Sequence, residues 1–173
     1  MKYNFSEIAK NGLILSLISI IILLANQFIT SKIPSLSILF WIIKFGGCIY
    51  LLYFFMKQHA SANSGITYKQ SANYGSLVSV FSAIAIGAYL TLHYYVIVPN
   101  AFSEAVETWL QLMAEQGMDM SSSLDIDTLE SNFPIYAAVG QIIYCSLFGL
   151  LASSIIANWT KDNTVKFDNL EQE

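Results

Sequence analysis

One lysine, Lys44, is the only formally charged residue inside a long apolar segment of this 173-residue sequence. An ionisable side chain within a membrane helix is by default a functional candidate, because burying a charge in lipid is costly. Counted along a helix, Lys44 lies roughly 12 Å from the outer end of its segment. Four further polar residues fall at nearby depths in the other apolar segments, and together the five predict a polar pocket that opens outward: Lys44, Asn26, Gln27, His93 and Gln141.

The same five residues also allow a simpler interpretation. Lysine can extend its ammonium group toward the headgroups, and amide and imidazole side chains can hydrogen-bond between helices as packing contacts. No Asp or Glu lies in the apolar segments, and His93 has neither a second histidine nor a serine nucleophile in a recognisable pattern. A catalytic set requires such partners. We therefore predict no catalytic residues and expect the chain not to be an enzyme.

Metal and cofactor chemistry is not indicated either. Cys48 and Cys145 both fall in apolar segments, which is typical of buried thiols that act as small hydrophobic residues. Two cysteines and two histidines without close spacing do not make a zinc site. Asp125-Ile126-Asp127 resembles the DxD motif of metal-dependent enzymes, but acids at a helix start usually cap the helix. We predict no bound metal and no cofactor; weak binding of divalent cations stays open.

Composition predicts an integral membrane protein. Hydrophobic residues make up 55% of the sequence and charged residues only 12%, where soluble proteins average about 25% charged residues. The charges lie almost entirely outside four apolar segments, each long enough to cross a bilayer as a helix. The fold class is therefore an all-α membrane four-helix bundle forming a single domain, 1–173, with spans at about 12–30, 37–56, 72–98 and 134–159.

Lysine placement predicts the orientation of the four spans. Six lysines lie on the side of the two termini and the middle loop: Lys2, Lys10, Lys57, Lys69, Lys161 and Lys166. Only Lys32 lies on the other side. Because cytoplasmic loops carry an excess of positive residues, both termini are expected in the cytoplasm. The sequence contains no arginine, and without a basic patch nucleic-acid binding is not expected.

The segment between spans three and four is acidic and patterned. Residues 100–133 contain seven acids and no basic residue. Apolar residues recur at helical spacing, which predicts an amphipathic helix from about Phe102 to Gln116, ended by Gly117. A second short helix is expected near Asp127 to Phe133, before Pro134 opens the last span. The two helices would form an extracytoplasmic helical hairpin.

Small residues repeat along spans three and four. Such ridges let helix backbones approach each other closely. They could serve packing within the chain, pairing with a second copy, or docking on a membrane-protein partner. Span three contributes Gly75, Ser79, Ala83 and Gly87, and span four contributes Cys145, Gly149, Ser153 and Ala157.

The start of span three carries a local helix signature. Thr67 and Gln70 fit a capping box, in which each side chain satisfies a backbone donor of the other residue. Asn63-Ser64-Gly65 before it predicts a turn.

These features resemble a family of small four-span membrane proteins from Bacteroidota, the domain-of-unknown-function family numbered 4199. The resemblance covers nearly the whole chain and depends on four features: a short lysine-bearing N-terminus before span one, the stretch from Asn63 to Ala72, Val98-Pro99 before the acidic helix, and Pro134. It implies four spans and a bacterial inner-membrane location, and it brings no established catalytic residues.

The sequence thus favours a non-enzymatic small inner-membrane protein that acts as an accessory or scaffold subunit docked on a membrane partner. The alternative is a small transporter or lipid-handling protein that uses the polar pocket around Lys44. The expected partners are the lipid bilayer and either a membrane protein or further copies of this chain.

Overall fold

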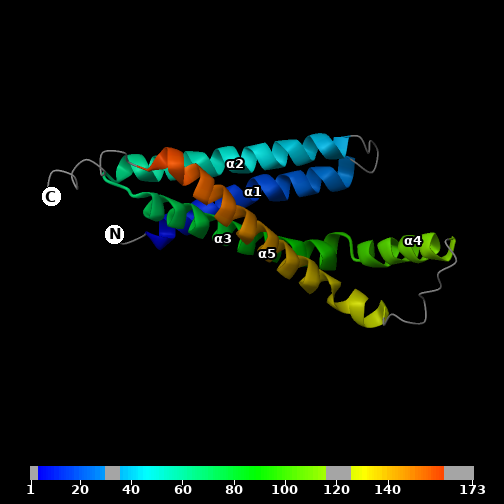
Figure 1. Ribbon diagram of the computed structural model, residues 1–173. Helices are drawn as coiled ribbons and strands as arrows, with labels where there is room; N and C mark the ends of the chain where they lie inside the picture. The colour runs from blue at the N-terminus through cyan, green and yellow to red at the C-terminus, as the bar shows by residue number, and fades with distance from the viewer. Residues whose placement is uncertain (1–3, 30–35, 116–125, 162–173) are drawn as a thin grey trace. The chain divides into compact units, whose positions relative to one another are not determined.

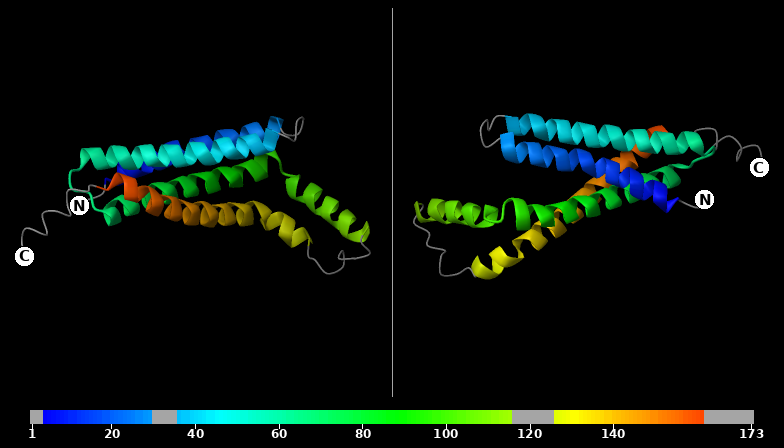
Figure 2. Two further views of the ribbon diagram at one scale, coloured as in Figure 1. Left: turned by 45° about the horizontal axis from the view of Figure 1, so that its top comes forward. Right: turned by 180° about the vertical axis from the view of Figure 1, so that it is seen from behind.

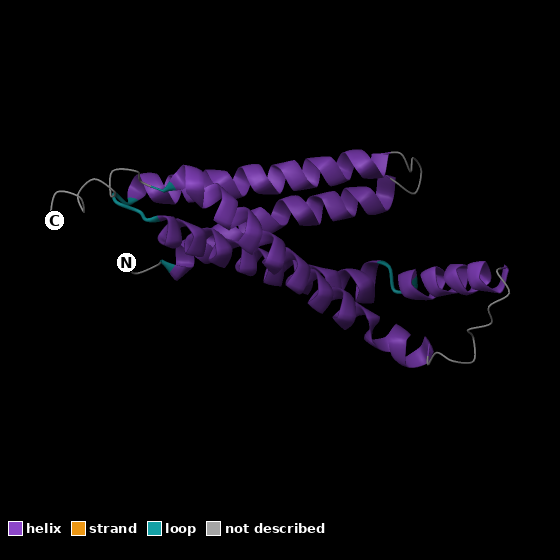
Figure 3. Ribbon diagram, in the orientation of Figure 1, coloured by secondary structure: helices purple, strands orange, loops and turns teal. Residues whose placement is uncertain are grey.

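The computed structural model describes residues 4–29, 36–115 and 126–161, and in this part of the chain helices are joined by short connections, without strands (Figures 1 and 3). The helices follow in the order α1 (Phe5–Ile29), α2 (Leu36–Ala62), α3 (Tyr68–Leu92), a π-helical segment (His93–Ile97), α4 (Ala101–Glu115) and α5 (Ile126–Thr160). The predicted all-α class is confirmed. Lys2, Lys32, Gly117, Asp125 and Lys166 lie outside the described residues.

Four of these helices are long and apolar enough to cross a membrane: Phe5–Ile29, Leu36–Ala62, Tyr68–Ile97 and Asp127–Thr160. Each coincides with one predicted span, so the chain is a membrane protein with four spanning helices. The helices extend beyond the predicted spans at several ends. A helix does not have to stop at the hydrocarbon boundary, because polar side chains can continue it through the headgroup region.

The chain divides into two compact parts. The first comprises Met1–Ile86 and Ile142–Glu173, and the second comprises Gly87–Gln141. Helices α3 and α5 contribute to both. Each part is compact by itself, and the single domain expected from the sequence remains a prediction.

In the first part, α1 and α2 pack along each other. The start of α1, the end of α2, the start of α3 and the end of α5 meet at one end (Figures 1 and 2). Apolar side chains from all four helices form the core there: Ile8, Leu15, Leu52, Phe55, Met56, Tyr74, Val78, Ala152, Ile156 and Ala157. This end of the bundle is therefore the best-packed region of the first part.

The connection from α2 to α3 has the predicted geometry. Gly65 takes a φ of 75°, a left-handed conformation that glycine adopts without steric cost. The Thr67 amide donates to the Gln70 side chain at 3.0 Å, and the Gln70 amide donates to the Thr67 hydroxyl at 3.3 Å. The predicted capping box is confirmed, and it fixes where α3 begins.

The second part contains the amphipathic helix α4. Its bounds agree with the predicted helix at about Phe102 to Gln116, and no residue of α4 is buried. The Phe102 ring lies 4.7 Å from the Phe133 ring, and Tyr94 lies 4.8 Å from Phe133, measured between centroids. The Ser103 hydroxyl also donates to the Glu130 carboxylate. These contacts join the start of α4 to the start of α5.

The prediction of a separate short helix before Pro134 is wrong. The segment near Asp127 to Phe133 is the beginning of α5, which runs on without interruption, so that Pro134 lies inside the helix. A proline inside a helix removes one backbone hydrogen bond and costs about 3 kcal/mol. Phe133, directly before the proline, is the residue that contacts the rings of Tyr94 and Phe102.

Candidate functional site

A cluster of polar side chains lies in the packed end of the first part. It draws Glu7 and Asn11 from α1, His59 from α2 and Tyr74 from α3. Glu7 and Asn11 are four residues apart, so they share one face of their helix. We call this set the Glu7–His59–Tyr74 cluster. It connects three helices that are distant in the sequence.

The Tyr74 hydroxyl is the centre of the hydrogen bonds in this cluster. It accepts a hydrogen bond from the Asn11 side-chain amide at 2.8 Å and donates one to Glu7 Oε1 at 3.1 Å. Tyr74 is only 1% exposed and Asn11 8%. Buried polar groups are costly unless they are hydrogen-bonded, so these bonds stabilise the contact between α1 and α3.

His59 completes the cluster from α2. Its ring is stacked on the Tyr74 ring, and its Nδ1 lies 3.5 Å from Glu7 Oε1. The histidine is 7% exposed, and within the described residues neither ring nitrogen has a hydrogen-bond partner. A protonated His59 would form an ion pair with Glu7. The contact of His59 with Glu7 and the two hydrogen bonds of Tyr74 hold the start of α1 against α2 and α3.

A second polar contact closes the same end of the bundle. Ser71 on α3 and Thr160 on α5 are both buried, and their hydroxyls lie 2.7 Å apart. The Thr160 hydroxyl also donates to the Ile156 carbonyl at 3.3 Å. Since α1 and α2 meet α3 in the cluster and α5 meets α3 here, hydrogen bonds and ring contacts connect all four helices of the first part.

The predicted pocket around Lys44 is divided between the two compact parts. Lys44 and Asn26 are half-buried in the first part, and Gln27 is exposed there. His93 and Gln141 belong to the second part, where His93 is buried with its Nδ1 3.1 Å from the Tyr89 hydroxyl. His93 also begins the π-helical segment, a feature often found at functional sites. The complete pocket remains a prediction.

The small-residue ridges of α3 and α5 face each other within the first part. A Cβ added to Gly149 would meet the Ser79 side chain, with the Ser79 hydroxyl 2.6 Å away. A Cβ added to Gly75 would meet Ser153 Oγ at 2.7 Å and Met56 Sδ at 2.6 Å. Ala83 and Ala157 are also buried, whereas Cys145 is half-buried; Gly87 belongs to the second part. At Gly75 and Gly149, these ridges serve packing within the chain.

Helix α1 approaches α3 closely at Gly12, which the small-residue ridges do not predict. A Cβ on Gly12 would lie 2.9 Å from the Val78 carbonyl oxygen and 2.6 Å from Phe81 Cβ. The backbones of α1 and α3 are therefore nearly in contact at this point. A lone glycine in a leucine-rich segment shows no four-residue repeat, so spacing alone does not single it out.

The sequence does not predict the Glu7–His59–Tyr74 cluster either. Glu7 and His59 lie outside the predicted spans 12–30 and 37–56, so the sequence does not indicate them as intramembrane partners. The spacing of Glu7 and Asn11 on one helical face was the available signal. Nothing local in the sequence indicates that His59 and Tyr74 would lie opposite them.

Metal-ligating groups do not gather in the described residues: no three His, Cys, Asp or Glu side chains lie together in a way that could hold an ion. Cys48 and Cys145 are not joined in a disulfide. The question of the Asp125-Ile126-Asp127 motif stays open, since Asp125 lies outside the described part.

Comparison with known proteins gives one match. The model of a family described as protein of unknown function (DUF4199) matches residues 10–161, which is most of the chain. The match begins after Glu7 and includes Asn11, His59 and Tyr74. No curated protein and no solved structure matches the chain.

Proposed function

The chain belongs to the DUF4199 family of proteins of unknown function, and on that premise we propose that it is a non-enzymatic accessory subunit of a bacterial inner membrane. In this proposal it docks on a membrane-protein partner through helix α4, with its N and C termini in the cytoplasm. The partner offers α4 an apolar groove bordered by basic side chains.

The exposed apolar edge of α4 is the observation that carries the proposal. The helix lies outside the four candidate spans, and none of its residues is buried. Trp109 is 37% exposed and Leu112 is 51% exposed, and their spacing of three residues puts them on one edge of the helix. An amphipathic helix with an uncovered apolar face is a common element of helix-in-groove recognition.

The charge of this region favours a basic protein as the partner of α4 and disfavours the membrane surface. Glu104, Glu107 and Glu115 are all exposed on α4, and residues 100–133 contain no basic residue. Helices that lie on anionic membranes carry lysine and arginine on their polar face. An acidic helix is repelled by such a surface, whereas a basic groove attracts it.

Lysine placement supports the orientation. Lys10, Lys57, Lys69 and Lys161 all belong to the first part, at the end where α1 begins and α5 ends. Excess lysine marks the cytoplasmic side. The acidic α4, between spans three and four, is then extracytoplasmic, where it would meet an extracytoplasmic segment of the partner.

Affinity purification from native membranes in mild detergent tests the proposal. A partner held by the apolar edge of α4 should bind Leu112→Asn about tenfold more weakly, because central apolar contacts dominate interface energies. Gln111→Asn is the matched control: the residue is exposed, adjacent and on another face of the helix. The control should retain the partner, and high salt should weaken the complex.

Two outcomes would overturn the proposal. One is a co-purifying membrane protein that is retained equally by wild type, Leu112→Asn and Gln111→Asn. The other is turnover of a substrate by the purified chain alone, which would show that the chain is an enzyme.

A further inference from the structure

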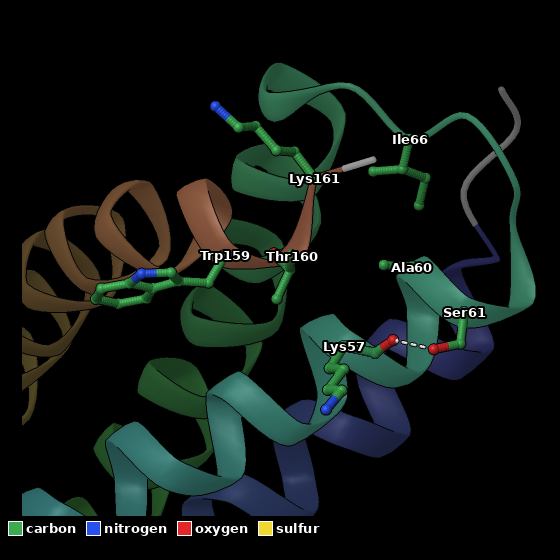
Figure 4. A pocket seen from close by; sticks show the side chains of 7 residues that line it. All are labelled: Lys57, Ala60, Ser61, Ile66, Trp159, Thr160 and Lys161. Atoms are coloured by element: carbon green, nitrogen blue, oxygen red, sulfur yellow. Dashed lines mark hydrogen bonds between the residues drawn. The ribbon is translucent and has the colours of Figure 1, made fainter. Parts of the chain in front are cut away.

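A pocket of about 220 Å³ lies between the end of α2 and the end of α5 (Figure 4). It lies entirely within the first compact part. The residues that line it are Lys57, Ala60, Ser61, Ile66, Trp159, Thr160 and Lys161.

We propose that this pocket binds the phosphate group of an anionic phospholipid headgroup. The proposal is independent of α4 and of any partner protein.

The first observation that supports an anion site is the positive charge on two sides of the pocket. Lys57 comes from α2, and Lys161 directly follows α5. Within the described part of the chain neither ammonium group has a carboxylate partner, since the one ion pair there joins His59 and Glu7. The Lys57 ammonium lies instead over the Tyr53 ring, 5.7 Å from its centroid. Two lysines on one pocket, without acidic partners among the described residues, attract an anion, and their flexible stems let both ammonium groups reach it.

The pocket walls are fixed by contacts within the chain. Its hydroxyls are held in place: Ser61 donates to the Lys57 carbonyl at 2.9 Å, and Thr160 is bonded to Ser71 at 2.7 Å. Ile66 is 1% exposed, so it closes one wall with apolar surface. Figure 4 shows the two lysine side chains extending away from each other on opposite sides of these residues. Both ammonium groups lie at the outside of the lining residues in this view, so both flexible lysine side chains turn inward to bind a phosphate.

Trp159 indicates that the phosphate belongs to a lipid. Its side chain is 71% exposed, and it lies one residue before the end of the fourth spanning helix. Exposed tryptophans at span ends lie at the headgroup level of the bilayer. A phosphate in the pocket is then at headgroup depth, beside an aromatic ring that can contact the glycerol and the upper acyl chains. Free phosphate would gain nothing from Trp159.

The test uses the full-length chain in nanodiscs of phosphatidylcholine. Phosphatidylglycerol is added, and native mass spectrometry measures how much of it binds to the chain. Wild type should prefer phosphatidylglycerol over added phosphatidylcholine. The attraction between one lysine and an anionic lipid is strong enough that removing the lysine should weaken phosphatidylglycerol binding about fivefold. Lys57→Gln and Lys161→Gln should each show this loss, and the double variant a larger one.

Three comparisons keep the test decisive. Lys69→Gln removes an exposed lysine that does not line the pocket, and it should bind as wild type does. Lys161→Arg keeps the charge and should retain binding. Inorganic phosphate at millimolar concentration should displace little phosphatidylglycerol. Equal losses in Lys69→Gln and Lys161→Gln, or unchanged binding in the double variant, would overturn the site. Full displacement by inorganic phosphate would overturn the lipid assignment.

Discussion

The rings of His59 and Tyr74 lie face to face, with centroids 3.8 Å apart and planes 3° from parallel. The two residues come from α2 and α3, and the hydroxyl of the tyrosine reaches Asn11 and Glu7 on α1. One aromatic contact and two hydrogen bonds thus join three spanning helices. In lipid, helix association depends on such packing and polar contacts, because apolar surface gains little by leaving lipid tails. The cluster is therefore a stabilising element of the bundle.

The Tyr74 hydroxyl provides the most direct test of this stabilising role. Tyr74→Phe keeps the stacked ring but leaves the buried Asn11 amide without its acceptor. We expect the free energy of unfolding to fall by about 1–2 kcal/mol, the usual cost of an unsatisfied buried donor. Denaturation of the purified protein in mixed detergent micelles measures it. Tyr50→Phe is the matched control, because Tyr50 is 70% exposed, and it should change little. Equal effects of the two variants would contradict the prediction.

His59 contributes through its ring more than through its nitrogens. Within the described residues neither nitrogen has a hydrogen-bond partner, whereas the ring is buried against Tyr74. His59→Phe keeps the stack and should cost less than about 1 kcal/mol. His59→Ala leaves a cavity and should cost about 2 kcal/mol or more. The same denaturation measurement compares them. If phenylalanine is as destabilising as alanine, the nitrogens hold a partner and the ring-based explanation is wrong.

The four spans could be predicted from the sequence because each depends on local composition. A long apolar run must become a helix in lipid to satisfy its own backbone groups. The capping box at Thr67 and Gln70 and the amphipathic helix α4 are likewise local patterns, with periods of three to four residues. The structure reproduces all of them, since tertiary contacts were not needed to specify them.

Contacts between distant segments could not be predicted in the same way. His59 is 15 residues before Tyr74 and far from Glu7 in the sequence, and only the bundle brings them together. Helix α5 continues through Pro134, and Phe133 before it contacts Tyr94 and Phe102 from other parts of the sequence. Local propensity predicts a helix start at the proline, whereas the helix begins eight residues earlier, at Ile126.

Gly12 should be the glycine of α1 and α2 least tolerant of a side chain. An added methyl group would meet the Val78 carbonyl oxygen at 2.9 Å, and a backbone atom cannot rotate away. Gly12→Ala is expected to lower the free energy of unfolding by about 1–3 kcal/mol, the cost of overpacking. Gly46→Ala is the matched control, because nothing lies within 4 Å of its added Cβ. That substitution should be neutral or stabilising by up to about 1 kcal/mol. A neutral Gly12→Ala would show that α1 and α3 are not in close contact.

Orientation can be tested with single cysteines in a variant that lacks Cys48 and Cys145. Ser64, in the turn between α2 and α3, and Gln111, on α4, are both exposed. If both termini are cytoplasmic, Gln111→Cys should react with a membrane-impermeant maleimide in intact spheroplasts. Ser64→Cys should react only after the membrane is permeabilised. Two crossings, α1 and α2, return the chain at Ser64 to the side where it begins, whereas α4 follows the third crossing. The reverse labelling pattern would place α4 in the cytoplasm and would remove the extracytoplasmic docking surface from the proposed function.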